Sequence, residues 1–170
     1  MSCATTEFPF DEFPHDISYD DLNRREVRSL IFHLLYAAEI FEYDASLDAL
    51  VDNFNRGFSL SIDPSSQTFK ITQEIIDSRE QLDELIRPLL HNWRFDRIGV
   101  CTKLILRYAV WELKNTQTPG PIIINEAIEL AKCFSEKDAY KFVNGILDEA
   151  VKKMERAVDR IEAPQEAPLD

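Results

Sequence analysis

The chain has 170 residues, a net charge of -12 and 45% hydrophobic residues, which is enough for one domain with a substantial core. It has only four glycines, none close to another, and three widely spaced cysteines without a CxxC pair, so neither a glycine-rich phosphate-binding loop nor a metal or disulfide framework is present. We therefore expect a reduced, cytoplasmic protein with no cofactor, no structural metal and no membrane-spanning segment.

The negative charge is concentrated at the two ends of the chain. Residues 1–21 hold six acidic side chains and no lysine or arginine, and residues 155–170 hold five acidic and two basic ones. These compositions predict a disordered acidic extension over 1–21, and a helix end with an acidic tail over 155–170. Residues 22–154, the predicted helical domain, keep only three of the twelve net negative charges. A nucleic-acid-binding surface in this domain is therefore compatible with the composition.

Apolar residues at three- and four-residue spacing predict the first two helices. One stripe covers 27–38, and Ser18 or Asp20 is the candidate N-cap of this helix. The next stripe covers 47–58 and follows Ser46, a residue type favoured at helix N-caps.

The middle of the chain continues the helical pattern. Gly57 falls near the end of the second stripe, where a left-handed closing residue is expected. The stripe over 69–90 predicts one long or broken helix, with Pro88 ending or bending it. Another helix is expected over 98–108, capped by Asp96.

The last third of the chain contains the one segment that could form a strand. "PIIIN" (121–125) has three consecutive β-branched residues, but it is short and no partner strand is evident, so an all-α fold is predicted. The "TQTPGP" stretch before it is typical of a loop. A shorter helix is expected over 125–134. Ser135 and Asp138 then resemble a capping box that opens a long last helix.

No catalytic motif accompanies these helices. GxSxG, HExxH and Walker sequences are absent, and the three histidines have no acid or cysteine at a telling separation. Asp83 and Glu84 are adjacent, so on a helix they point apart and are interpreted as solvated surface. The sequence therefore predicts that the protein is not an enzyme.

Basic and aromatic residues alternate along a second face of the first helix. Arg25, Arg28, Phe32 and Tyr36 follow at helical spacing, and Arg24 extends the positive charge. Guanidinium groups that neutralise phosphates, beside rings that stack on bases, suit single-stranded RNA. The other interpretation is that the arginines are ordinary surface residues and the two aromatic side chains pack under a neighbouring helix.

Three ordered blocks then resemble the NusB transcription antitermination family over roughly residues 24–152. The blocks are "RREVRSLIFHLLYAAE", "NWRFDRIGVCTKLILRYAVWEL" and "INEAIELAKCFSEKDAYKFVNGILDEAVKK". The resemblance implies an all-helical NusB-like fold, two small helical bundles packed into one globular domain. It also implies binding of boxA, a single-stranded element of nascent ribosomal RNA, together with NusE, a small-subunit ribosomal protein. The resulting antitermination complex keeps RNA polymerase transcribing.

The resemblance further implies two groups of RNA-contacting residues, at the start of the first helix and at the start of the "KFVNG" helix. Carried over position by position, they are Arg24, Arg25, Arg28 and Tyr36 in the first group and Asp138, Lys141 and Phe142 in the second. Phe142 lies at the edge of an apolar stripe, so it is expected to be partly core and partly a platform for a base.

The Asn144–Gly145 pair inside the "KFVNG" helix is unexpected, because both residue types weaken helices. Gly145 lies one turn after Lys141, where a missing side chain would allow another helix or an RNA backbone to approach closely. Helix packing and direct RNA contact are therefore both kept as explanations for the glycine. Asn144 is expected to hydrogen-bond to a neighbouring helix or loop.

The chain also departs from the family pattern. Glu26 and Val27 interrupt the basic block where further lysine or arginine is usual, which predicts weaker attraction to RNA. The acidic extension lies outside the resemblance, and we hypothesise that it competes with RNA for the arginines. We do not expect a family-related methyltransferase, because 170 residues leave no room for a doubly wound cofactor-binding domain and no suitable glycine loop occurs. The alternative that remains is a helical protein-binding adaptor without sequence-specific RNA binding.

Overall fold

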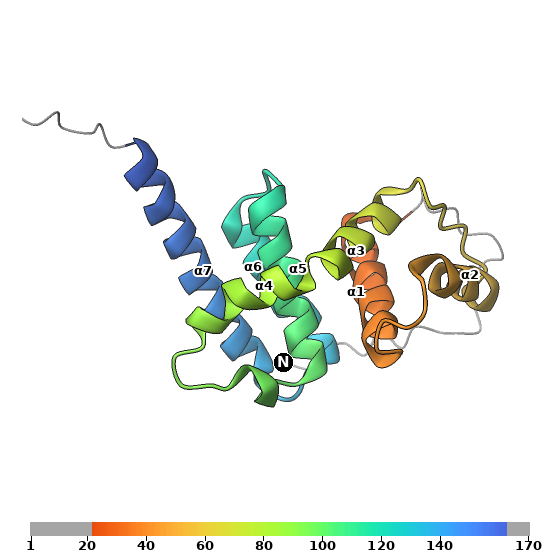
Figure 1. Cartoon of the computed structure of the whole chain (residues 1–170), viewed down its shortest axis with the longest axis horizontal. Helices are drawn as coiled ribbons and strands as arrows, with labels where there is room; N and C mark the ends of the chain where they lie inside the picture. The colour runs from red at the N-terminus through yellow and green to blue at the C-terminus, as the bar shows by residue number, and fades with distance from the viewer. Residues whose placement is uncertain (1–21, 163–170) are drawn as a thin grey trace, which may run out of the picture. The chain divides into compact units, whose positions relative to one another are not determined.

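The structure, a computed structural model, describes residues 22–162, with side chains to residue 155. The described chain forms two compact units, residues 22–70 and 71–162 (Figure 1). Seven α-helices and no β-strand occur in this range, so the predicted all-α fold is confirmed. The predictions for the acidic extension and for the tail after residue 162 lie outside the described residues.

Helix α1 (Arg24–Ile40) begins at a capping box. The Asn23 side chain accepts hydrogen bonds from the backbone N–H groups of the first turn, and the Glu26 carboxylate accepts the Asn23 N–H at 2.7 Å. Each of these bonds satisfies a backbone donor that the helix itself leaves unpaired. The cap is therefore Asn23, and the prediction of Ser18 or Asp20 is wrong.

Helix α2 (Leu47–Phe58) has the predicted cap at one end only. The Ser46 hydroxyl accepts the Ala49 N–H at 3.3 Å, which confirms the N-cap. Gly57 lies inside the helix, and the left-handed residue that closes α2 is Ser59, with φ 52°. The prediction for Gly57 is wrong because the helix continues for one residue beyond it.

The first unit is built on the packing of α1 against α2. Its buried apolar residues come from one side of each helix and from the following loop: Ile31, Phe32, Leu34, Leu35, Ala38, Leu47, Leu50, Val51 and Ile62. The Asn55 side chain ties that loop to α2, because its amide donates to the Ile62 carbonyl at 2.9 Å and accepts the Ile62 N–H at 2.8 Å.

The long apolar stripe of the middle region is two helices. Helix α3 (Gln67–Asp77) contains the boundary between the two units, and α4 (Arg79–Ile86) follows a break at Ser78. The Ser78 hydroxyl donates to the Glu74 carbonyl at 2.6 Å. Such side-chain competition for backbone groups is a recognised cause of helix interruption. Pro88 lies in the 3₁₀ turn directly after α4, as expected of a residue that ends the helix.

Helix α5 (Val100–Asn115) is the centre of the second unit. It packs against α4, α6 and α7, and every side chain from Leu104 to Glu112 is buried. A helix that is buried all round needs a partner for each charged side chain. Arg107 finds one in Asp83 of α4, with Nε–Oδ1 and Nη2–Oδ2 distances of 2.7 and 2.9 Å. The interpretation of Asp83 as solvated surface is therefore wrong.

The predicted cap of α5 is also wrong. Gly99 precedes the helix and provides no side-chain cap. Asp96 instead lies in a 3₁₀ turn, η3 (Phe95–Arg97), where both its carboxylate oxygens accept hydrogen bonds from Arg94. Hydrogen bonding from Arg94 lowers the pKa of the Asp96 carboxyl.

Helix α6 (Gly120–Phe134) starts five residues earlier than predicted. Pro121 lies in its first turn, where the missing N–H is no loss. The three isoleucines that follow have strand propensity, yet Ile123 is fully buried against neighbouring helices of the unit. Tertiary burial therefore overrides the local β preference.

Helix α7 (Ala139–Glu162) does not begin with the predicted capping box. Ser135 is the C-cap of α6, and its hydroxyl accepts a hydrogen bond from the Thr102 hydroxyl at 3.2 Å. Asp138 has a left-handed backbone, with φ 66°, directly before α7. Asp and Asn adopt this conformation more readily than other residues with a Cβ. Ser135 and Asp138 therefore belong to the turn between α6 and α7 and do not form a capping box for the last helix.

Candidate nucleic-acid interface

The arginines of the first candidate site lie on the first two turns of α1. Arg24 and Arg25 are exposed, and Arg28 is half-buried. The N-terminal end of a helix is electropositive, so positively charged side chains there do not stabilise the helix. A phosphate group, in contrast, is attracted both to the helix end and to the arginine side chains. The Glu26 carboxylate, which was expected to weaken RNA attraction, has a structural function as part of the capping box.

The two aromatic residues of this site differ in their exposure. Phe32 is only 3% exposed, and its ring contacts those of His33 and Tyr36, with centroids 5.6 and 6.4 Å apart. Tyr36 is 40% exposed. The prediction of Phe32 on an outward stripe is wrong, because it lies on the side of α1 that carries the buried Ile31 and Leu35. Tyr36 is left as the accessible ring of this group.

The second candidate site is the start of α7. Asp138 and Lys141 are both exposed, as expected, and their side chains form an ion pair at 3.0 Å. The hydrogen bond and the charge of Asp138 raise the pKa of Lys141. Phe142 is half-buried, which agrees with its expected place at the edge of the core.

An aromatic residue that the sequence patterns did not single out lies beside Phe142. Trp93, in the loop before α5, is 61% exposed, and its ring meets that of Phe142 edge to face with centroids 5.5 Å apart. The two residues are far apart in the chain, so helical periodicity could not connect them. The only sequence pattern that could have indicated Trp93 is a local one, because basic and aromatic residues alternate in "NWRFDR".

The Asn144–Gly145 pair lies on an open surface of α7. Both residues are exposed, and a Cβ added to Gly145 would meet no atom within 4 Å. Close packing against another helix of the described chain is therefore not the reason for the glycine.

The two candidate groups belong to different units. Arg24, Arg25, Arg28, Phe32 and Tyr36 lie in the first unit, whereas Asp138, Lys141, Phe142 and the additional Trp93 lie in the second. The structure brings residues together within each group, so each group forms a surface of its own unit.

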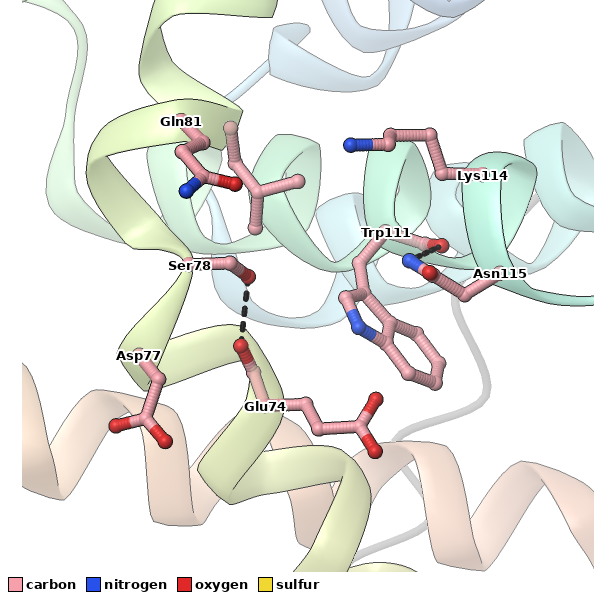
Figure 2. A pocket seen from close by; sticks show the side chains of 8 residues that line it. Glu74, Asp77, Ser78, Gln81, Trp111, Lys114 and Asn115 are labelled. Atoms are coloured by element: carbon pink, nitrogen blue, oxygen red, sulfur yellow. Dashed lines mark hydrogen bonds between the residues drawn. The ribbon is translucent and has the colours of Figure 1, made fainter.

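A polar hollow of about 270 Å³ occurs elsewhere in the second unit. Figure 2 shows it between the α3–α4 junction and the last turns of α5, with Glu74 and Asp77 from one side and Trp111 and Lys114 from the other. Its lining contains no histidine or cysteine, so it offers no Ser–His or Cys–His pair for nucleophilic catalysis.

Metal-ligating side chains do not cluster in the described part of the chain. Among residues 22–162, no three histidine, cysteine, aspartate or glutamate side chains gather in a way that could hold a metal ion. In the same range, every helix is too short or too polar to span a bilayer.

Comparisons with known proteins identify the family to which this chain belongs. The model of the NusB family matches residues 25–152 of the chain. The chain belongs to the NusB family. It is 35% identical to the transcription antitermination protein NusB of Staphylococcus carnosus, over 74% of this chain and 97% of that protein. It is 36% identical to NusB of Campylobacter concisus, over 74% of this chain and 93% of that protein.

Solved structures of NusB proteins have the same fold. The structure of T. maritima NusB matches with a TM-score of 0.66 and 29% identity, over 78% of this chain and 92% of that one. The solution structure of Aquifex aeolicus NusB matches with a TM-score of 0.59 and 22% identity, over 85% of this chain and 95% of that one. The predicted NusB-like fold is therefore confirmed.

Proposed function

We propose that this chain is an antitermination factor that binds boxA-type single-stranded RNA of nascent ribosomal RNA together with NusE. It acts in the cytoplasm, catalyses no reaction of its own, and supports processive transcription as part of the RNA polymerase antitermination complex. Membership of a family of transcription antitermination proteins supports this class of function.

The observation that carries the RNA proposal is the cationic start of α1. Arg24, Arg25 and Arg28 gather within two turns at the electropositive end of a helix, in a chain whose net charge is -12. Positive side chains at this end are unfavourable for the helix dipole, whereas phosphate groups are attracted to both the side chains and the helix end. The exposed ring of Tyr36, on the same helix, supplies a surface for stacking on an unpaired base.

The start of α7 supplies the second group of proposed contacts. Lys141 is exposed and, like any lysine, positively charged at neutral pH, so it can contact a phosphate if its ion pair with Asp138 opens. Phe142 presents only part of its ring. Phe32 is not proposed as an RNA contact, because it is buried.

The test is binding of a labelled boxA-like strand and a scrambled control, with and without NusE, at two salt concentrations. We expect selective binding that is tighter with NusE and weaker at high salt. In an Arg24→Ala/Arg25→Ala/Arg28→Ala variant, the slope of log affinity against log salt should fall by up to about 2, since each phosphate contact on a single strand contributes about 0.7.

The matched control is Arg56→Ala. Arg56 is an exposed arginine of the same unit, paired with Asp52 on α2 and outside the proposed site. It should leave RNA binding unchanged. If the triple variant also binds RNA like the wild type while NusE binding persists, the adaptor function is favoured and the RNA proposal fails.

A further inference from the structure

The segment that joins α4 to α5 is basic within an acidic chain. We call residues 87–103 the basic loop; it includes the 3₁₀ turns η2 (Arg87–Leu89) and η3 and the first turn of α5. Its charged residues, apart from histidine, are four bases and one acid: Arg87, Arg94, Arg97, Lys103 and Asp96. The local charge of +3 is opposite in sign to the net charge of -12, so an anionic partner is favoured here.

Three of the four cations of the basic loop have contacts within the loop before any partner binds. The Arg87 guanidinium carbon lies 4.5 Å from the centre of the Phe95 ring, and the Lys103 ammonium lies 5.2 Å from it. Both are within the range of cation–π attraction. Arg94 is fixed by its two hydrogen bonds to Asp96. Side chains that are already ordered lose less entropy when they bind a phosphate.

Trp93 projects from the same loop. The neighbouring Leu90 and Ile98 are buried and anchor the loop, whereas Trp93 is 61% exposed. The Trp93 ring meets that of Phe142 of α7 edge to face, and this contact restricts the rotation of Trp93. A large accessible ring on a segment that also carries several cations suits a single-stranded nucleic acid, which presents bases for stacking and phosphates for ion pairing.

We propose that Trp93 is a stacking platform for one unpaired base of the RNA, and that the basic loop contacts the phosphates next to that base. This extends the surface at the start of α7, through Phe142 and Lys141, to a second chain segment. The inference rests on the RNA binding proposed above. An acidic protein surface would match the charge of the loop, but RNA supplies flat rings and phosphates together.

The first experiment measures the affinity of full-length variants for the boxA-like strand. Trp93→Ala should weaken binding by about 5- to 100-fold, as expected for the loss of one base–aromatic stack. Trp93→Phe keeps an aromatic ring and should regain most of the affinity. Ile122→Ala is the matched control, because Ile122 is a large side chain of the same unit that is 50% exposed and lies on α6, outside the basic loop. It should bind RNA like the wild type.

The second experiment uses tryptophan fluorescence, since the chain has only two tryptophans and Trp111 is buried. In a Trp111→Phe variant, Trp93 is the only tryptophan, and its emission should be quenched when the RNA binds. If that variant does not fold, the quenching seen in the wild type should disappear in Trp93→Phe.

The outcomes separate this inference from the function on which it rests. Wild-type affinity of Trp93→Ala, together with lost affinity of the α1 arginine variant, overturns the inference and leaves the RNA function intact. A wild-type chain that binds no RNA overturns both. If Trp93→Ala loses NusE and keeps RNA, the basic loop is a protein-binding surface and the inference is wrong.

Discussion

The starts of α1 and α7 both carry basic and aromatic residues, but they differ in which rings they expose. On α1 the ring that follows the arginines, Phe32, is 3% exposed and belongs to the core. Beside α7 the accessible ring is Trp93, which comes from a different segment and is 61% exposed. Spacing along one helix therefore identifies neighbours on a face, but it does not tell which face is covered by the rest of the unit.

The two helix starts also use their acidic residues differently. Glu26 accepts a backbone N–H in the capping box of α1. Asp138 instead pairs with Lys141, the cation that would contact RNA at α7. An acid that holds backbone structure is required for the helix, whereas an acid paired with an exposed lysine contributes little to stability and can yield to a ligand.

The largest effect is expected for Phe32→Ala, which tests whether this ring is core or surface. Removing a fully buried phenylalanine side chain should lower the free energy of unfolding by about 3–5 kcal/mol. Tyr36→Ala removes a ring of similar size from a 40% exposed position and should be much less destabilising. Chemical denaturation of both variants gives the comparison. Equal stabilities would place Phe32 on the surface after all.

A smaller effect is expected for Asn23→Ala, which removes the cap beside the arginines. The loss of an N-cap should destabilise the protein by about 0.5–2 kcal/mol. It should also fray the turn that carries Arg24 and Arg25, and so weaken RNA binding. Ser46→Ala is the matched control, because it removes the equivalent cap of α2 without touching the arginines. If both variants bind RNA equally, the order of the first turn of α1 does not matter for binding.

Buried residues explain most of the difference between what the sequence predicted and what the structure contains. The apolar stripes of α1 and α2 are strong because each helix has one buried face, so these two helices were predicted at nearly the right places, whereas α5 continues to Asn115, beyond the predicted end at 108. Helix ends were less predictable, because several residues near each end are equally good candidates for the cap. The caps at the start of α1, the end of α2 and the start of α5 are Asn23, Ser59 and Gly99, and other residues had been predicted at each.

Contacts between distant segments were the part that the sequence could not reveal. Asp83 looked like solvated surface because its partner, Arg107, is on another helix. Trp93 was missed for the same reason, since only the fold places it against Phe142. The candidate site on α1 was predictable because it is local, whereas the surface at α7 depends on two segments.

Gly145→Ala tests whether the open face of α7 is kept clear for a partner. Because the added Cβ meets no atom, the substitution should stabilise the chain by about 0.5–1 kcal/mol through helix propensity. RNA or NusE binding should nevertheless weaken if either approaches this face. Gly57→Ala is the matched control: Gly57 is also helical, exposed and surrounded by open space. A loss of stability in Gly145→Ala alone would instead indicate that the face is covered by the chain itself.

The smallest effect is expected for Asp138→Asn, which changes the charge at the start of α7 and keeps a residue type that tolerates its left-handed backbone. The pKa of Lys141, raised mainly by the Asp138 hydrogen bond, should fall toward its ordinary value of 10.5, as NMR titration of the lysine side chain can measure. Because the folded-state pKa is raised, any stabilisation by the pair is fully present below pH 10.5 and is lost as the pH rises through the raised value. The difference in stability between variant and wild type should therefore be constant from about pH 6 to about pH 8.

The control is Asp148→Asn, which breaks the exposed pair with Lys152 and should leave the titration of Lys141 unchanged. A Lys141 titration that is the same in wild type and Asp138→Asn would show that the two side chains are not paired in solution, and the contrast between the acids of α1 and α7 would disappear.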